Sequence, residues 1–324
     1  MSKRDPTEEA LNALSELRRN PSSPQFKRQL VSYLGHRSNL VIAKAAKTSG
    51  ELRITELIPD LAAAFQRLMA NPAKLDKGCA AATAIAGALY AMDYDSAEVY
   101  LKGVRHVQME GSYGPPVDAA AQLRADSALG LIRTRHPDAV FEVVRLLADK
   151  ETRVRAAAAR ALGSLVDETG ELLLLLKALT GDSESDVLAE CFSGMLGSGA
   201  ERSLAFVAAQ LDHKDEASAE AAALSLGGSR LPGAIEALRE KWDRTVHGPM
   251  RRVLLLALAT ARQDSALDFL LSIVAKGEPP IAAEVIQALG TYRNEERARK
   301  ALEETVEKRA DRQLRDAFQA EFRG

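Results

Sequence analysis

The ten residues VRAAAARALG, from Val154 to Gly163, recur in imperfect copies along the chain, each followed by a leucine-rich segment and an acidic turn. The step that closes each copy, Leu-Gly or once Leu-Ala, begins at Leu129, Leu162, Leu196, Leu226, Leu258 and Leu289, which gives spacings of 33, 34, 30, 32 and 31 residues. A period of this length is typical of solenoids built from helical repeats. The sequence therefore predicts a stack of helix pairs.

The pairs are clearest from residue 117 onward. The first helices are predicted near Val117–Thr134, Glu151–Leu165, Ser185–Leu196, Asp215–Leu226, Pro249–Ala261 and Pro279–Thr291. In the second helices, apolar residues recur at i, i+3, i+4 and i+7, as expected for a helix that buries one face. These stripes are Val140, Val143, Val144 and Leu147; Leu172, Leu175, Leu176 and Leu179; Leu204, Val207, Ala208 and Leu211; Ile235, Leu238 and Trp242; and Leu267, Leu270, Leu271 and Val274.

The front of the chain is less regular. Asp5, Pro6 and Glu8 form an acidic capping box for a first helix that should run to about Asn20, and Ser23-Pro24 opens a second helix. Further helices are predicted near Asn39–Thr48, Ile54–Ala70, Asp76–Ala91 and Ser96–His106, with a period of about 40 residues. The Gly- and Pro-rich segment Gly111–Pro116 then forbids helix. We expect a single solenoid over 1–324, with irregular repeats at 1–116, regular repeats at 117–308 and a charged cap helix at 309–324.

Composition agrees with an all-α protein. Hydrophobic residues make up 46% of the chain and charged residues 27%, while aromatic residues make up only 5%, which favours closely packed alanine-rich helices over sheets. The first residues lack the apolar run of a signal peptide, and no uncharged apolar stretch is long enough to cross a bilayer. Cys79 and Cys191 lie far apart and are predicted to be buried free thiols. We expect a cytoplasmic protein with no membrane insertion.

The repeat from Val154 through Leu179 to Asp182 resembles the HEAT repeat, and is most similar to the variety named for phycobilisome lyases. The resemblance implies an all-α fold, a right-handed α-α superhelix of about eight to nine helical pairs, whose usual role is protein recognition. Some relatives are bilin lyases or DNA-base glycosylases, so the fold alone does not exclude an enzyme. One departure concerns the arginine of the motif, which is kept at Arg155 and Arg251 but replaced by Ala219 and Ala282, so a continuous Asp-Arg ladder between repeats is not expected.

The residues themselves give no catalytic constellation. The histidines are His36, His106, His136, His213 and His247, and none has a second histidine or cysteine at ligand spacing, so we expect no metal. The carboxylate pairs Glu8-Glu9, Asp215-Glu216 and Glu303-Glu304 are adjacent in sequence and point about 100° apart on a helix. No nucleophile elbow or phosphate-binding loop is present. We therefore predict no catalytic residue and no cofactor. The segment Gly111–Pro116, with Tyr113, either holds a ligand or is a solvent loop.

Nucleic acid is not expected as a partner. Trp242 and Asp243 lie among Arg239, Lys241, Arg244, Arg251 and Arg252, which would suit a base-stacking tryptophan beside a catalytic aspartate. However, Trp242 follows Ile235 by seven residues on the apolar stripe, which favours core packing. Residues 81–293 also carry 22 basic and 29 acidic side chains, and this net negative charge opposes a phosphate backbone.

A candidate partner-binding ridge emerges when the second helices are aligned. Leu174, Phe206 and Phe269 share one register position, two residues after the first stripe residue, and Arg145 and Lys177 flank them. If the second helices line the concave surface, these residues form an apolar ridge there for a protein partner. The alternative is lateral packing between neighbouring second helices.

The sequence thus predicts a non-enzymatic scaffold or adaptor that binds a partner protein in its concave groove. The alternative is a bilin-lyase-like or other accessory enzyme or chaperone that acts on a partner protein, and a DNA-base glycosylase is a third, less favoured reading.

Overall fold

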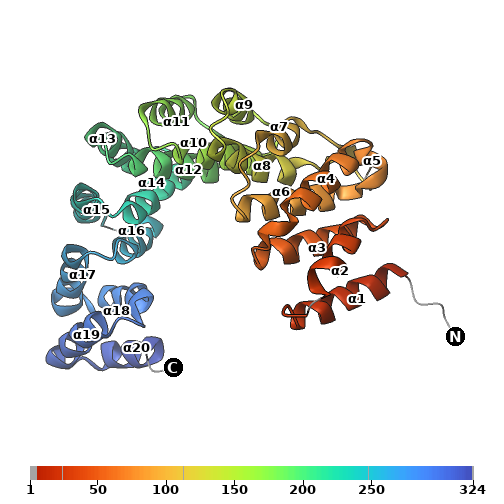
Figure 1. Cartoon of the computed structure of the whole chain (residues 1–324). Helices are drawn as coiled ribbons and strands as arrows, with labels where there is room; N and C mark the ends of the chain where they lie inside the picture. The colour runs from red at the N-terminus through yellow and green to blue at the C-terminus, as the bar shows by residue number, and fades with distance from the viewer. Residues whose placement is uncertain (1–5, 24, 112, 247, 323–324) are drawn as a thin grey trace. The chain divides into compact units, whose positions relative to one another are not determined.

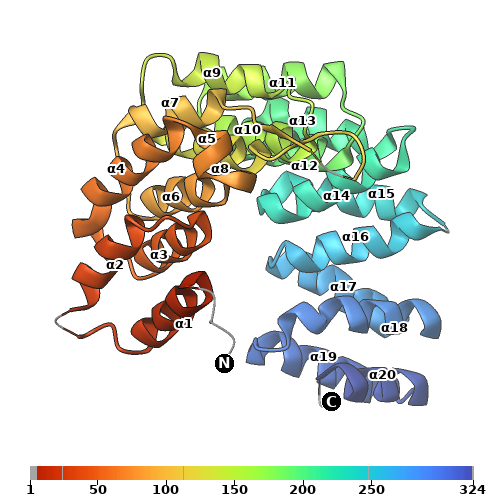
Figure 2. The ribbon, with the colours of Figure 1, turned by 90° about the vertical axis from the view of Figure 1, so that its right-hand side faces the viewer.

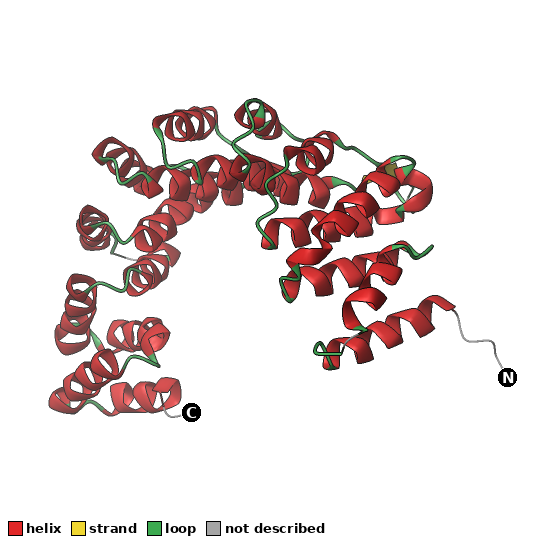
Figure 3. Cartoon of the chain, viewed as in Figure 1, coloured by secondary structure: helices red, strands yellow, loops and turns green. Residues whose placement is uncertain are grey.

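The computed structural model describes residues 6–23, 25–111, 113–246 and 248–322, over which twenty α-helices and one two-stranded sheet are found (Figure 1). The predicted all-α, HEAT-like fold class is confirmed, and Figure 3 shows helices joined by short loops along both halves of the chain. The chain divides into two compact units, Met1–Leu165 and Val166–Gly324. Asp5, Pro24 and His247, which entered the sequence predictions, lie outside the described residues.

The first unit contains ten α-helices, two 3-10 helices and a hairpin of two short strands. The elements in chain order are α1 (Pro6–Arg19), α2 (Phe26–Leu34), α3 (Asn39–Glu51), η1 (Thr55–Leu57), α4 (Ile58–Met69), α5 (Pro72–Leu75), η2 (Lys77–Cys79), α6 (Ala80–Ala91), α7 (Ala97–Arg105), β1 (Met109–Glu110), β2 (Val117–Asp118), α8 (Ala121–Arg133), α9 (Ala139–Leu146) and α10 (Thr152–Gly163).

The second unit consists of helices and loops over its described residues, with no strand among them. Its elements are α11 (Glu168–Thr180), α12 (Ser185–Gly197), α13 (Glu201–Ala209), η3 (Gln210–Asp212), α14 (Glu216–Ser229), α15 (Pro232–Arg244), α16 (Pro249–Thr260), α17 (Asp264–Lys276), α18 (Pro279–Ala288), η4 (Leu289–Tyr292), α19 (Glu296–Arg309) and α20 (Arg312–Phe322). Helix α20 lies where the charged terminal helix was expected.

Within each unit, alternate helices form two layers. In the first unit, α6 packs against α3 and α8, and α8 packs against α10, whereas α4 and α7 form contacts in the other layer (Figure 2). In the second unit, α14 packs between α12 and α16, while α13 contacts α15 and α17 contacts α19. Each helix pair therefore buries its apolar faces on the next pair, as a helical repeat requires.

One predicted helix is wrong at its start. The segment from Val117 was expected to open a helix, but Val117–Asp118 is strand β2 and pairs in antiparallel register with β1, Met109 opposite Asp118. Helix α8 begins only at Ala121. The reason is local, since the Asp118 carboxylate accepts hydrogen bonds from the backbone N–H groups of Gln108 and Ala120, at 3.2 and 3.0 Å, and holds the chain extended.

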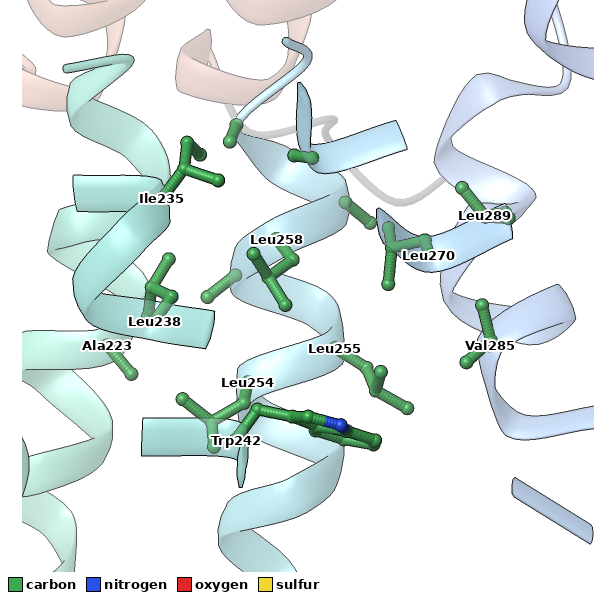
Figure 4. Close-up of a cluster of buried hydrophobic side chains, with 14 of the residues drawn as sticks. Ala223, Ile235, Leu238, Trp242, Leu254, Leu255, Leu258, Leu270, Val285 and Leu289 are labelled. Carbon is green, nitrogen blue, oxygen red and sulfur yellow. The ribbon is translucent and has the colours of Figure 1, made fainter. Parts of the chain in front are cut away.

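A continuous apolar cluster fills the second unit between its two layers. Figure 4 shows Ile235, Leu238 and Trp242 of α15 facing Leu254 and Leu258 of α16. Trp242 is only 7% exposed, so the predicted core position is confirmed. The guanidinium of Arg251 lies 3.7 Å from the centre of its ring and donates hydrogen bonds to the carbonyls of Thr245 and Val246.

The glycine of the repeated Leu-Gly step has a packing role at Gly227. A methyl group on Gly227 would lie 2.3 Å from the backbone oxygen of Ala257 in the neighbouring helix α16. Only a residue without a Cβ allows α14 and α16 to approach this closely. The small residues of the repeat thus set the short distance between neighbouring first helices.

Candidate protein-interaction surface

Helix α11 begins and ends at sequence signals that fix its position. The Asp167 side chain caps the helix by accepting a hydrogen bond from the Gly170 N–H at 2.8 Å. Gly181 follows the helix with a φ of 76°, a conformation that favours glycine. Between these ends, the run Leu172–Leu176 makes α11 apolar on every side, so its sequence has no clear buried face.

A buried carboxylate decides which face of α11 turns inward. Glu171 is 6% exposed and accepts hydrogen bonds from Arg202 of α13, from Nε at 3.0 Å and from Nη2 at 2.7 Å. The Ser203 hydroxyl donates a further hydrogen bond to it. The Arg202 and Ser203 hydrogen bonds lower the pKa of Glu171 to about 2. Gly170, Glu171 and Leu174 are consequently the buried residues of this helix.

The Glu171→Gln variant should be less stable than the wild-type protein at neutral pH, by about 1.5–3 kcal/mol, because hydrogen bonds to a charged group are lost. The pKa of Glu171 is depressed in the folded protein, so its ionisation stabilises the fold above the unfolded pKa near 4.5, and this contribution is lost as the pH falls toward about 2. Urea unfolding at several pH values should show the wild-type advantage shrinking across that window. An advantage that is constant from pH 7 to pH 2.5 would contradict the assignment.

The opposite face of α11 presents three leucines to solvent. Leu172 is 52% exposed, Leu176 58% and Leu179 66%. Their spacing, i, i+4 and i+7, places them along one side of the helix. We call Leu172, Leu176 and Leu179 the α11 leucine face. A row of large apolar side chains on one helix face is typical of a partner-binding surface.

The sequence-based register of α11 was therefore wrong. The stripe Leu172, Leu175, Leu176 and Leu179 was expected in the core, yet Leu172, Leu176 and Leu179 form the exposed face. Leu174, for which an exposed ridge and lateral packing were both left open, is 0% exposed. Five consecutive leucines carry no period, whereas the small residues Gly170 and Ala178, four positions to either side of Leu174, mark the side that packs closely. The sequence thus contains a signal for the buried face, but the predicted stripe rested on the spacing of the leucines alone.

Leu174 cannot belong to an exposed ridge, and the other two members of the predicted ridge are half-buried. Phe206 lies on α13 and Phe269 on α17, and both pack against the apolar cluster of the second unit. The guanidinium of Arg239, on the intervening helix α15, lies 4.8 Å from the centre of the Phe269 ring. This contact between neighbouring second helices favours the lateral-packing alternative for Phe269.

The two flanking cations, Arg145 and Lys177, lie in different units. Arg145, in the first unit, is exposed and lies 3.9 Å from Glu142, whose buried carboxylate also accepts a 2.7 Å hydrogen bond from Arg105. Lys177, in the second unit, forms a 2.8 Å ion pair with Asp182 and is mostly buried. Lys177 therefore stabilises the end of α11 and does not present a free charge.

The second helices of the second unit do not line an inner surface. In Figure 1, α13, α15 and α17 lie on the outer side of the curve that this unit makes, and α14, α16 and α18 lie on its inner side. The expectation that second helices face a concave groove is wrong for this unit. The physical reason is the alanine- and glycine-rich first helices, which approach one another more closely than the leucine-rich second helices and so take the inner side.

The described residues offer no site for metal chemistry. No group of three or more His, Cys, Asp or Glu side chains among them is arranged to hold a metal ion. Both cysteines are buried and free, and burial raises the thiol pKa of each to about 12. In the part of the chain that the structure describes, no helix is long and apolar enough to cross a membrane.

The stacked helix pairs place the protein in the class of all-α helical-repeat proteins. More specifically, the sequence model of the HEAT repeats family matches residues 117–193, so this part of the chain consists of HEAT-like repeats. The sequence matches no curated protein. The two arginines that keep the motif, Arg155 and Arg251, have the same structural role. Each donates hydrogen bonds to backbone carbonyls in the turn before its own helix.

Two solved structures resemble the chain at low identity. One is an engineered protein from the Northeast Structural Genomics Consortium, 17% identical, with 100% of this chain and 97% of that chain covered and a TM-score of 0.42. The other is the complex of CpcE and CpcF of phycocyanin lyase from Nostoc sp. PCC7120, 16% identical, with 87% and 93% covered and a TM-score of 0.40. Both scores are below 0.5, so neither likeness bears on function.

Proposed function

We propose that the protein is a non-enzymatic interaction scaffold and that it binds a partner protein through the α11 leucine face. The observation that carries the proposal is the exposure of Leu172, Leu176 and Leu179, each more than half accessible on one side of a single helix. A helix that is apolar all round is normally covered on every side. Protein recognition is also the general role of HEAT repeats, which supports the same conclusion.

The leucine face is held rigidly in place. The Glu171–Arg202 hydrogen bonds join α11 to α13, and Lys177 pairs with Asp182 just beyond the end of α11. A rigid apolar face loses little conformational freedom on binding, so this part of the cost of association is small. The partner surface that fits is an apolar groove or the apolar side of an amphipathic helix.

The triple variant Leu172→Ser, Leu176→Ser, Leu179→Ser should lose its partner while keeping its fold. Covering three leucines is worth about 3 kcal/mol or more, which corresponds to at least a hundredfold weaker binding. Substitutions at exposed positions usually change stability by less than about 0.5 kcal/mol each. The measurement is quantitative affinity purification from the native cells with mass spectrometry, together with thermal unfolding of the purified variant.

A matched control is the pair Leu224→Ser and Leu256→Ser. Both leucines are 43% exposed but lie on the first helices α14 and α16. Partners lost from the triple variant should be retained by this control. If the triple variant keeps every partner of the wild-type protein, the leucine face is not the binding surface.

The prediction that Phe206 and Phe269 contact a partner can be tested in the same assay with the double variant Phe206→Ser, Phe269→Ser. Leu174 is unsuitable for such a test because it is fully buried, and truncating a buried leucine costs about 2–5 kcal/mol of stability. The alternative function, an accessory enzyme acting on a partner protein, would need the same recognition step and is distinguished by a chemical change in the captured partner.

A further inference from the structure

A second candidate surface lies in the first unit, beside the hairpin that interrupts the helices. A cavity of about 980 Å³ opens between strands β1 and β2, the start of α8 and the turn that leads into α10. We call this cavity the hairpin groove. Its lining brings together residues far apart in the chain, among them Gly78, Met109, Val117, Arg124, Asp149 and Lys150.

The hairpin wall of this groove is fixed to the helices behind it. The Gln108 amide donates hydrogen bonds to the Asp76 carbonyl at 3.0 Å and to the Glu110 carboxylate at 2.6 Å. The Gly78 N–H donates to the same Glu110 carboxylate at 2.7 Å. Gln108 is buried, so its hydrogen bond to the Asp76 carbonyl lies away from competing water. The groove is thus a built feature of the fold with a firm wall.

The floor of the groove is a buried ion cluster whose charges are already used. Arg124, 3% exposed, donates from Nε and Nη2 to Asp149 at 2.9 and 3.0 Å, and its Nη1 lies 2.7 Å from Asp118. Burial opposes ionisation of Asp118, but the Ala120 and Gln108 N–H groups and Arg124 together keep its pKa below the usual value. This cluster has a structural role, because its single cation is shared between two nearly buried carboxylates.

The mouth of the groove combines apolar side chains with free cations. Val107, Met109 and Val117 are 59%, 58% and 54% exposed. Lys150 and Arg153 are exposed, and neither side chain pairs with a carboxylate in the described part of the chain. The half-buried Glu151 and the two carboxylates of the Arg124 cluster balance the three cations of the lining, so the exposed positive charge is confined to the mouth, on Lys150 and Arg153.

We infer that the hairpin groove binds an extended segment of a protein partner in which an apolar side chain stands next to acidic residues. The apolar side chain would cover Val107, Met109 and Val117, and the acidic residues would meet Lys150 and Arg153. The inference does not depend on the α11 leucine face, which lies in the other unit and takes an apolar partner surface. Charge complementarity at the rim supplies orientation, and apolar burial supplies most of the affinity.

A random twelve-residue peptide library displayed on phage tests this inference on the full-length protein. Peptides enriched on the wild-type protein should carry Asp or Glu next to Leu, Ile, Phe or Met. Synthetic copies of these peptides should bind at least tenfold more weakly to the double variant Lys150→Glu, Arg153→Glu. Their binding should also weaken as salt is raised from 50 to 500 mM, because the charges are exposed.

Folding is separated from binding by the choice of variants. Arg153 lies in the first turn of α10, where glutamate interacts favourably with the helix dipole, so the double variant should fold normally. Arg28→Glu with Arg37→Glu, two exposed cations elsewhere in the first unit, gives the same change of net charge and should leave peptide binding unchanged. Val117→Ser should weaken binding through the apolar contact alone.

Three results would overturn the inference. The first is a library that yields no enriched sequences combining acidic and apolar residues. The second is a set of enriched peptides that bind the Lys150→Glu, Arg153→Glu variant as tightly as the wild-type protein. The third is an equal loss of peptide binding in the Arg28→Glu, Arg37→Glu control. A triple serine variant of the α11 leucine face should bind these peptides normally, so failure of the proposed function and failure of this inference give different outcomes.

Discussion

The Arg124→Ala variant should lose about 3–5 kcal/mol of unfolding free energy, because removing one partner of a buried ion cluster leaves the other charges uncompensated. Arg124 is 3% exposed, and its guanidinium forms ion pairs with both Asp118 and Asp149 while also donating to the His106 carbonyl at 2.9 Å. Without it, two nearly buried carboxylates would face each other across a void. Urea unfolding followed by far-ultraviolet circular dichroism measures the loss.

The control for this prediction is Arg28→Ala, an exposed arginine of the same unit, which should change stability by less than about 0.5 kcal/mol. A triple variant with Asp118→Asn and Asp149→Asn added to Arg124→Ala should recover part of the stability, since the unpaired charges are then gone. If Arg124→Ala unfolds at the wild-type urea concentration, the cluster does not stabilise the first unit.

The Trp242→Ala variant should lose about 3–5 kcal/mol as well, by a different mechanism, since truncating a large buried aromatic residue leaves a cavity. Trp242 is 7% exposed among Leu238, Leu254 and the rest of the apolar cluster (Figure 4). The Arg251 guanidinium lies over its ring, 3.7 Å from the ring centre. Thermal unfolding should show a large fall in the midpoint temperature.

Trp242→Phe serves as the matched variant, because it keeps most of the apolar volume and should cost clearly less than the alanine substitution. The same pair of variants addresses the nucleic-acid alternative. A Trp242→Ala protein that melts normally but loses salt-sensitive binding to DNA would show that the residue serves recognition and not packing. We expect the opposite, a destabilised protein.

Much of the fold could be predicted because its signals are local. The Leu-Gly step recurs from Leu129 to Leu289, and the capping aspartates Asp167 and Asp215 each accept a hydrogen bond from a backbone N–H three residues later. The buried stripe of α15, Ile235, Leu238 and Trp242, was also predictable, since charged residues occupy much of the remaining surface of that helix. In such a helix only the apolar side can face the core.

The candidate surfaces were harder to predict. The α11 leucine face was missed because Leu172–Leu176 fits every register equally, and the choice between registers rests on Arg202, 31 positions beyond Glu171. The hairpin groove was missed because its parts are distant in sequence, with Gly78, Asp118 and Asp149 all in one lining. The segment Gly111–Pro116 was correctly expected to break the helix, but its neighbours were not expected to pair as strands.

The class of this protein is predictable from sequence alone, because helix propensity and capping act within a few residues and a repeat of about 32 residues is visible along the chain. Tertiary structure decided which face of an apolar helix is covered and which charges are free. Leu174 is buried and Leu176 exposed because the Glu171 carboxylate binds Arg202, and Lys150 is free while Arg124 is neutralised because only Arg124 lies between two carboxylates. Pairings between residues so far apart in the chain depend on how the helices stack, and that arrangement is a property of the folded molecule.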